Sequence, residues 1–206
     1  MYGLYAITPE RIRGFNLVSQ VEQAIQGGAR LIQYREKGDA GAEKFTEAKA
    51  ILHLCRINNV QLIINDDVEL AYAIAADGVH LGRNDSDPVL ARQKLGHTAI
   101  IGVSCYNNLD LAVKAQLAGA NYVAFGRFFS STTKPQATGA TLELLYQAKS
   151  HVHLPIVAIG GITATNGKFL INAGADMLAV VGGIFSSEDI KVAALNLSSL
   201  FVNKVI

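Results

Sequence analysis

One pattern recurs eight times along the chain: a short apolar run rich in β-branched residues, then a stretch with helical periodicity, about every 25 residues. Strands that alternate with helices form parallel sheets, because parallel neighbours need a crossover segment between them. The recurrence therefore predicts a parallel α/β fold. The predicted strands are YGLYAIT (2–8), RLIQYR (30–35), QLIIN (61–65), GVHLG (78–82), IIGVSC (100–105), YVAFG (122–126), PIVAIGG (155–161) and MLAVVGG (177–183).

The segments between the predicted strands support this fold. Residues 42–58, 109–118 and 164–173 carry apolar side chains at helical spacing. Several segments end in Gly-Ala just before the next strand, as at Gly28, and glycine is favoured there because it adopts the left-handed backbone that follows a helix. Eight such units predict a (β/α)8 TIM barrel, with residues 1–206 as a single domain. A doubly wound open sheet is the alternative.

Composition excludes several classes of function. Half of the chain is apolar and 17% is charged, which is typical of a globular protein. The formal net charge of +1 gives no reason to expect nucleic acid or an acidic membrane surface as a partner. No apolar stretch approaches the ~20 residues that span a bilayer, no signal peptide is evident, and the two cysteines lack metal-ligand spacing. We therefore expect a cytoplasmic protein.

Polar side chains gather at the carboxyl ends of the predicted strands, where TIM barrels carry their chemistry. In LIQYREKG, Gln33, Arg35 and Lys37 occupy alternate positions, so their side chains share one face of a strand. An edge strand with one solvated face is the structural alternative. In a barrel mouth, an unpaired cation costs on the order of several kcal/mol. We therefore expect an anionic ligand there, because a guanidinium group binds phosphate oxygens well.

A second polar group follows the third and fourth predicted strands. One of Asn65, Asp66 and Asp67 is expected to cap the next helix, and Asp87 is a better cap candidate than Asp85. Because these two strands are neighbours in the barrel, the carboxylates of Asp66 and Asp85 are expected to converge. Two carboxylates with room for phosphate oxygens predict a magnesium site.

Another loop and a strand end are expected at the same mouth. The loop SSTTKP after the sixth strand offers Ser131, Thr133 and Lys134, which either bind a ligand or form an ordinary polar turn. Ser104 lies at the end of the fifth strand, and its position alone does not favour catalysis over a place at the rim of the core. His80 is interpreted as a wall residue with satisfied hydrogen bonds.

Glycine pairs follow the seventh and eighth strands, in IGGIT (159–163) and VVGGIF (180–185). Such turns let backbone amides approach a ligand closely, and the helix N-terminus that follows favours an anion. Phosphate sites recur after these two strands in TIM barrels. The pairs therefore predict a phosphate site, with tight turn geometry alone as the alternative.

Together, these motifs resemble the thiamine phosphate synthase (thiamin-phosphate pyrophosphorylase) family over nearly the whole chain. The resemblance is carried by LYAIT, QYREK, IINDD, GVHLGRND, IGVSC, FGRFFSSTTK, AIGGIT with Asn166, and GADMLAVVGGIF, in this order. It implies a transferase of thiamine biosynthesis. That enzyme joins the diphosphate of 4-amino-5-hydroxymethyl-2-methylpyrimidine to 4-methyl-5-(2-phosphoethyl)thiazole and releases thiamine phosphate and pyrophosphate.

The resemblance also implies roles for individual residues, with Mg²⁺ as the cofactor. The implied catalytic residues are Arg35, Lys37, Ser104 and Lys134. The implied substrate-binding residues are Gln33, Arg35, Lys37, Asn65, Ser104, Ser131, Thr133, Lys134, Gly161, Val181 and Gly182. The implied metal ligands are Asp66 and Asp85.

The chain departs from the family pattern at a few positions. In the loop after the sixth strand, Arg127 replaces a proline and Ser131 replaces a threonine. The motif HLGQxD becomes HLGRND at Arg83, and Gly182 stands where serine is frequent. Ser131 keeps a hydroxyl group and Gly182 keeps a backbone amide, whereas the pattern does not explain Arg83 or Arg127.

Two rival functions fit the same scaffold. A thiazole tautomerase would need a general base but no diphosphate site, so the retained Arg35, Lys37 and Lys134 argue against it. A catalytically silent protein that binds thiamine precursors would keep the same side chains. An activity assay is needed to distinguish it from a synthase. The expected partners are the two small-molecule substrates, with no nucleic acid and no membrane, and a homo-oligomer is compatible with the sequence.

Overall fold

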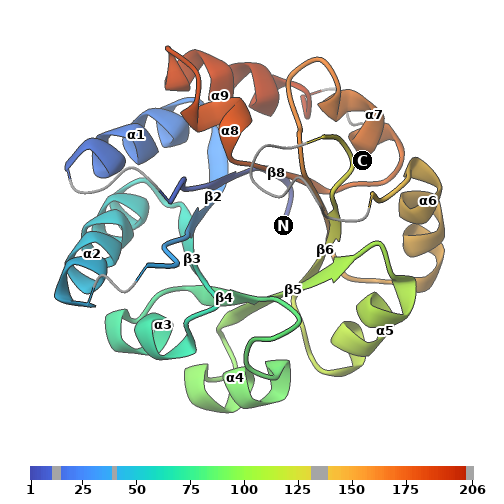
Figure 1. The fold of residues 1–206 in the computed structure, drawn as a ribbon, viewed down its shortest axis with the longest axis horizontal. Coiled ribbons are helices and arrows are strands. Elements are labelled where there is room, and N and C mark those ends of the chain that lie inside the picture. The colour runs from blue at the N-terminus through green and yellow to red at the C-terminus, as the bar shows by residue number, and fades with distance from the viewer. Residues whose placement is uncertain (11–14, 39–40, 131–138, 203–206) are drawn as a thin grey trace.

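Parallel strands close into a barrel in chain order, and β8 pairs back onto β1 (Figure 1). The computed structural model describes residues 1–10, 15–38, 41–130 and 139–202. The strands are β1 (Gly3–Ile7), β2 (Ala29–Tyr34), β3 (Gln61–Asn65), β4 (Gly78–Leu81), β5 (Ile100–Tyr106), β6 (Tyr122–Gly126), β7 (Ile156–Ile159) and β8 (Met177–Val180). Each predicted run overlaps one of these strands, and the strands close into a barrel, so the predicted (β/α)8 barrel is confirmed and the open sheet is excluded.

Helices form a ring around the outside of the barrel (Figure 1). They are α1 (Phe15–Gln26), α2 (Gly41–Ile57), α3 (Val68–Ile74), α4 (Pro88–Leu95), α5 (Leu109–Leu117), α6 (Leu142–His151), α7 (Gly167–Asn172), α8 (Gly182–Phe185) and α9 (Ile190–Ser199). The helix predicted over 164–173 begins later, at Gly167, because Asn166 first closes a turn in which its Oδ1 accepts a hydrogen bond from the Thr163 amide at 2.8 Å. In the described part of the chain, none of the helices combines the length and apolarity needed to traverse a bilayer.

The apolar core has two parts, separated by the strands. The larger part fills the space between the barrel and the helices, where residues such as Ile32, Ile64 and Leu178 are fully buried. The smaller part lies inside the barrel. Its buried members are Tyr5, Ile7, Leu31, Ile63, Tyr122, Ala124, Val157, Met177 and Ala179. Alternate strand residues thus face either the helices or the barrel interior, as the pleat of a strand requires.

Two predicted helix caps are found at the rim of the barrel. Asp67 caps α3 through its Oδ1, which accepts a hydrogen bond from the Leu70 amide at 2.8 Å. Asp87 caps α4 through its Oδ1, which accepts from the Val89 amide at 2.7 Å. Each aspartate satisfies an amide that has no partner within its helix. These two carboxylates are therefore occupied structurally, which leaves Asp66 and Asp85 for other roles.

Candidate active site

A cavity of about 530 Å³ opens at the carboxyl ends of the strands. The predicted site residues in its lining are Gln33, Arg35, Asn65, Ser104, Gly161, Val181 and Gly182. They come from β2, β3 and β5 and from the turns after β7 and β8, so closure of the barrel brings together residues that are far apart in the sequence. Ser131, Thr133 and Lys134 lie outside the described residues.

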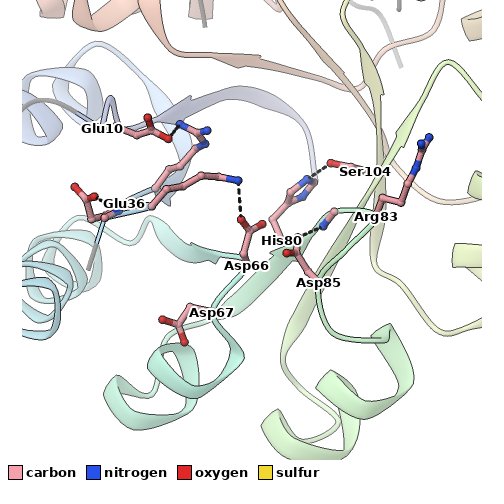
Figure 2. A network of polar contacts seen from close by, with 12 residues as sticks. Glu10, Glu36, Asp66, Asp67, His80, Arg83, Asp85 and Ser104 are labelled. Atoms are coloured by element: carbon pink, nitrogen blue, oxygen red, sulfur yellow. Dashed lines mark hydrogen bonds and ion pairs between the residues drawn. The ribbon is translucent and has the colours of Figure 1, made fainter. Parts of the chain in front are cut away.

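Arg35 follows β2 directly and lies at the cavity wall with a counter-ion from the chain itself. Its side chain is 12% exposed, and its Nη1 lies 2.5 Å from Oε1 of Glu10 (Figure 2). Its backbone amide donates a hydrogen bond to Oγ1 of Thr8 at 2.8 Å, which fixes where the chain leaves the barrel. Arg35 is therefore not the unpaired cation that the sequence predicted, because the segment after β1 supplies a carboxylate. An anionic ligand has to compete with Glu10 for this guanidinium group.

Lys37 lies further out on the same rim. Its side chain is half-exposed, and its Nζ lies 3.2 Å from Oδ2 of Asp66. The three alternate positions that begin at Gln33 thus run outward from the barrel interior. Gln33 is buried, Arg35 is mostly buried, and Lys37 reaches solvent. This gradient places an amide deepest in the cavity and two cations above it.

Asp66 and Asp85 converge at the ends of β3 and β4, as predicted (Figure 2). Asp66 adopts a left-handed backbone with φ of 63°, which aspartate tolerates better than most residues. Its amide donates to the carbonyl of His80 on the neighbouring strand at 2.8 Å. Asp85 Oδ2 accepts a hydrogen bond from the Gly82 amide at 2.6 Å. The two carboxyl groups are close enough to hydrogen-bond each other.

The two aspartates titrate in opposite directions because they share this contact. Partial burial by itself would raise the pKa of Asp66, but the hydrogen bond with Asp85 and the ammonium group of Lys37 outweigh it and lower that pKa. Partial burial and the neighbouring Asp66 together raise the pKa of Asp85. Two carboxyl groups forced together in this way form a site that a divalent cation would stabilise.

The donor set suits Mg²⁺ better than a metal held by protein ligands alone. Within the described ranges, no group of three or more His, Cys, Asp or Glu side chains is arranged to hold a metal ion. Mg²⁺ commonly takes one or two carboxylates and completes its shell with water and phosphate oxygens. The pair formed by Asp66 and Asp85, next to the cations that would hold a phosphate, matches this kind of coordination.

The glycine turns after β7 and β8 pack against each other. A Cβ on Gly183 would lie 2.5 Å from the carbonyl oxygen of Ile162, so only glycine fits. Gly161 has φ of 63°, and a Cβ there would lie 2.3 Å from the carbonyl oxygen of Ser130. Tight packing therefore explains part of the glycine requirement. Gly161, Val181 and Gly182 nevertheless line the cavity, and their role in holding a phosphate stays a prediction.

A chain of hydrogen bonds crosses the barrel below the cavity. Gln33 Nε2 donates to the Tyr5 hydroxyl at 2.6 Å, and the Tyr5 hydroxyl lies 2.8 Å from that of Tyr122. The Tyr122 hydroxyl lies 2.9 Å from Nδ1 of His80, and Nε2 of His80 lies 2.8 Å from Oγ of Ser104. Both ring nitrogens of His80 therefore have partners, which confirms its interpretation as a satisfied wall residue.

Burial keeps the phenols of this chain neutral. Desolvation raises the pKa of Tyr5, and its hydrogen bonds with Tyr122 and Gln33 offset only part of that effect. Desolvation, together with the nearby Tyr5, raises the pKa of Tyr122 as well. Each phenol thus retains one proton that it can donate.

Sequence reasoning missed Tyr5 and the polar role of Tyr122. Both lie inside apolar runs, where an aromatic side chain is normally a packing residue. The signal that could have identified them is the face of the strand on which each tyrosine lies. Tyr5 alternates with Leu4 and Ala6, which face the helices, so its side chain faces the barrel interior.

One departure from the family pattern has a structural explanation. The guanidinium carbon of Arg83 lies 4.7 Å from the ring centroid of Tyr106, and the Arg83 amide donates to the Tyr106 hydroxyl at 3.1 Å. Tyr106 lines the cavity and has φ of 56°. Arg83 therefore supports an aromatic side chain at the rim. Arg127 lines the cavity, which places the second unexplained arginine within reach of a ligand.

Comparison with known proteins identifies the family to which the chain belongs. The family model described as TMP-TENI, thiamine monophosphate synthase, matches residues 4–184. The chain is 48% identical to the thiamine-phosphate synthase of Methylococcus capsulatus, over 97% of this chain and 89% of that protein. It is 50% identical to the thiamine-phosphate synthase of Methylobacillus flagellatus, over 97% of this chain and 95% of that protein.

A solved structure shows the same fold with recognisable sequence similarity. The thiamine phosphate pyrophosphorylase of Pyrococcus furiosus superposes with a TM-score of 0.87 at 33% identity, over 97% of this chain and 95% of that one. The family model spans most of the chain, and the relatives exceed 30% identity over nearly their whole lengths. On the fold, the cavity and these matches, the chain belongs to the thiamine monophosphate synthase family.

Proposed function

We propose that this protein is a thiamine-phosphate synthase, a transferase that releases pyrophosphate. It condenses 4-amino-5-hydroxymethyl-2-methylpyrimidine diphosphate with 4-methyl-5-(2-phosphoethyl)thiazole to give thiamine phosphate. One observation carries the proposal. Predicted residues from both substrate sites line a single cavity, namely Gln33, Arg35, Asn65 and Ser104 together with the glycine turns after β7 and β8. We further propose that residues 1–206 act as one catalytic domain in the cytoplasm.

The positions of the charges support a mechanism driven by departure of an anion. The bond between the pyrimidine methylene carbon and the diphosphate oxygen breaks, and the electron pair leaves with pyrophosphate. Arg35 and Lys37 neutralise the negative charge that grows on the leaving group, and Ser104 donates a hydrogen bond to it. The ring amine of the pyrimidine stabilises the cationic carbon. The thiazole nitrogen then supplies the electron pair of the new C–N bond.

No side-chain nucleophile is required by this reaction, so positioning accounts for much of the rate. The cavity holds the pyrimidine carbon and the thiazole nitrogen in line, which replaces a bimolecular encounter in water. The side chains of Asp66 and Asp85 would hold Mg²⁺ at the rim. The ion would supply positive charge to the diphosphate oxygens.

A reconstitution assay tests the proposal. The purified protein is mixed with both phosphorylated precursors and Mg²⁺, and thiamine phosphate and pyrophosphate are measured together. We expect equal amounts of the two products and neither product when one precursor is omitted. Arg35→Ala and Lys134→Ala are expected to reduce turnover by about 10²-fold or more without unfolding the protein, because charge stabilisation in the transition state is lost. Near-normal product formation by either variant would reject its assignment.

The same assay separates the rival functions. Isomerisation of a thiazole precursor without pyrophosphate release would support a tautomerase. Calorimetry that detects binding of both precursors, with no product formed in the presence of Mg²⁺, would support a silent binding protein. Either result would contradict the proposed synthase.

A further inference from the structure

The hydrogen-bond chain below the cavity has a direction. Gln33 can donate to Tyr5 only through its Nε2, and the Tyr5 hydroxyl therefore accepts at that end. The proton of Tyr5 then has Tyr122 as its acceptor within the chain, at 2.8 Å. The proton of Tyr122 in turn has Nδ1 of His80 as its acceptor, at 2.9 Å. Each phenol has one proton to donate, so this order satisfies both hydroxyl groups.

The direction fixes the tautomer of His80. A proton on Nδ1 would face the Tyr122 hydroxyl, and Tyr122 would then have to donate toward Tyr5. Tyr5 would receive two donors and would have no acceptor in the chain for its own proton. His80 therefore carries its proton on Nε2, which donates to Oγ of Ser104 at 2.8 Å. The Ser104 oxygen accepts this bond, and its own proton is available to the cavity that Ser104 lines.

We propose that Tyr5, Tyr122 and His80 are positioning residues that couple the amide orientation of Gln33 to the hydrogen-bonding character of Ser104. At one end, Nε2 of Gln33 is bound to Tyr5, so the acceptor that this amide group can offer to a ligand is its carbonyl oxygen. At the other end, Ser104 presents a hydroxyl donor. The two ends therefore offer a hydrogen-bond acceptor at Gln33 and a donor at Ser104, which suit the ring amine and the diphosphate of the substrate in the proposed function.

This inference deepens the proposed function and rests on it for the choice of ligand, but its first test does not. Nitrogen NMR of the unliganded protein reports which ring nitrogen of each histidine carries a proton, and His80→Asn assigns the signal. We expect His80 to be neutral with its proton on Nε2. Tyr5→Phe removes the hydroxyl group through which Gln33 imposes this direction. The Nδ1–H tautomer is therefore expected to appear at His80, although Tyr122 lies between the two residues.

A matched control is available in β2. Tyr34 is also a buried tyrosine whose hydroxyl has a partner, Oε2 of Glu47 at 2.8 Å, but it faces the helices. Tyr34→Phe is expected to leave the His80 tautomer unchanged. Should Tyr5→Phe fail to fold, Tyr122→Phe breaks the same chain one link nearer to His80. Thermal melting of each variant shows whether a change in the NMR signal reflects the chain or a loss of the fold.

The second test measures the ligand preference directly. The 4-amino pyrimidine monophosphate and its 4-oxo analogue, which presents an acceptor in place of the amine, are titrated against wild type and Tyr5→Phe. Wild type is expected to prefer the amine by about tenfold or more, because the oxo group would face the carbonyl oxygen of Gln33. Tyr5→Phe is expected to lose most of this preference, because the amide of Gln33 is then free to turn over.

Failure of this proposal can be distinguished from failure of the proposed function. An imidazolium or an Nδ1–H tautomer at His80 in wild type overturns the proposal whatever the enzyme does. An unchanged tautomer and an unchanged amine preference in a folded Tyr5→Phe also overturn it, because the tyrosine would then be only structural. Absence of thiamine phosphate synthesis would refute the proposed function while the NMR result still decides the direction of the chain.

Discussion

Replacing Glu10 with glutamine is expected to strengthen the binding of pyrophosphate. Glu10 Oε1 lies 2.5 Å from Nη1 of Arg35, so it occupies the guanidinium group that a diphosphate would use. The Glu10 side chain is 40% exposed, so water screens the pair, which then contributes on the order of 1 kcal/mol. An anion that displaces the carboxylate loses this contribution. Removing the charge should therefore lower the dissociation constant of pyrophosphate by about fivefold.

Isothermal titration calorimetry with inorganic pyrophosphate and Mg²⁺ measures this change. The difference between wild type and Glu10→Gln should shrink at high ionic strength, because salt screens exposed charges. Glu69→Gln is the control, since it breaks the exposed ion pair with Lys94 at 2.8 Å on α3 and α4. It should leave pyrophosphate binding unchanged. Equal or weaker binding by a folded Glu10→Gln variant would refute competition and would show that Glu10 orients Arg35 for its ligand.

Three further predictions follow from other parts of the molecule. Asp85→Asn should raise the Mg²⁺ concentration needed for half-maximal turnover by about tenfold or more, as measured by Mg²⁺ titration, because one of two carboxylate ligands is lost; an unchanged requirement would remove Asp85 from the site. Gly78→Ala should lower the free energy of unfolding by about 3 kcal/mol in urea melts, because its Cβ would lie 1.9 Å from the carbonyl oxygen of Ile100. The control Gly139→Ala should change that free energy little, because its Cβ would meet only the carbonyl oxygen of Arg127, at 4.0 Å. Burial raises the pKa of the Cys55 and Cys105 thiols to about 12. The unfolded thiols ionise first as pH rises, so stability is lost above the ordinary pKa of 9.0 by up to about 1.4 kcal/mol per pH unit for each thiol. Urea melts at several pH values should show a shallower loss when both cysteines are replaced by alanine, and equal slopes would contradict the reasoning.

Much of the fold was predictable because the signals that specify it are local. A strand and the helix after it need only the residues of one repeat to show their periodicity, and parallel order follows from the need for crossovers. The positions of Asn65, Asp66 and Asp85 at the rim could be predicted in the same way, since Asn65 ends β3, Asp66 follows it and Asp85 lies in the loop after β4. The assignment of Asp67 and Asp87 as helix caps was also local, because a cap binds an amide two or three residues away.

The sequence by itself therefore determined the eight repeats, the strand ends and the kinds of side chain that reach the barrel mouth. The tertiary structure alone decided which of those groups are paired. Glu10 reaches Arg35 because β1 and β2 are adjacent in the barrel. Tyr5 meets Tyr122, 117 residues away, because the closed barrel turns both side chains into one interior. Periodicity encodes which face a residue occupies, but the partner across the barrel depends on closure and register, which no single repeat contains.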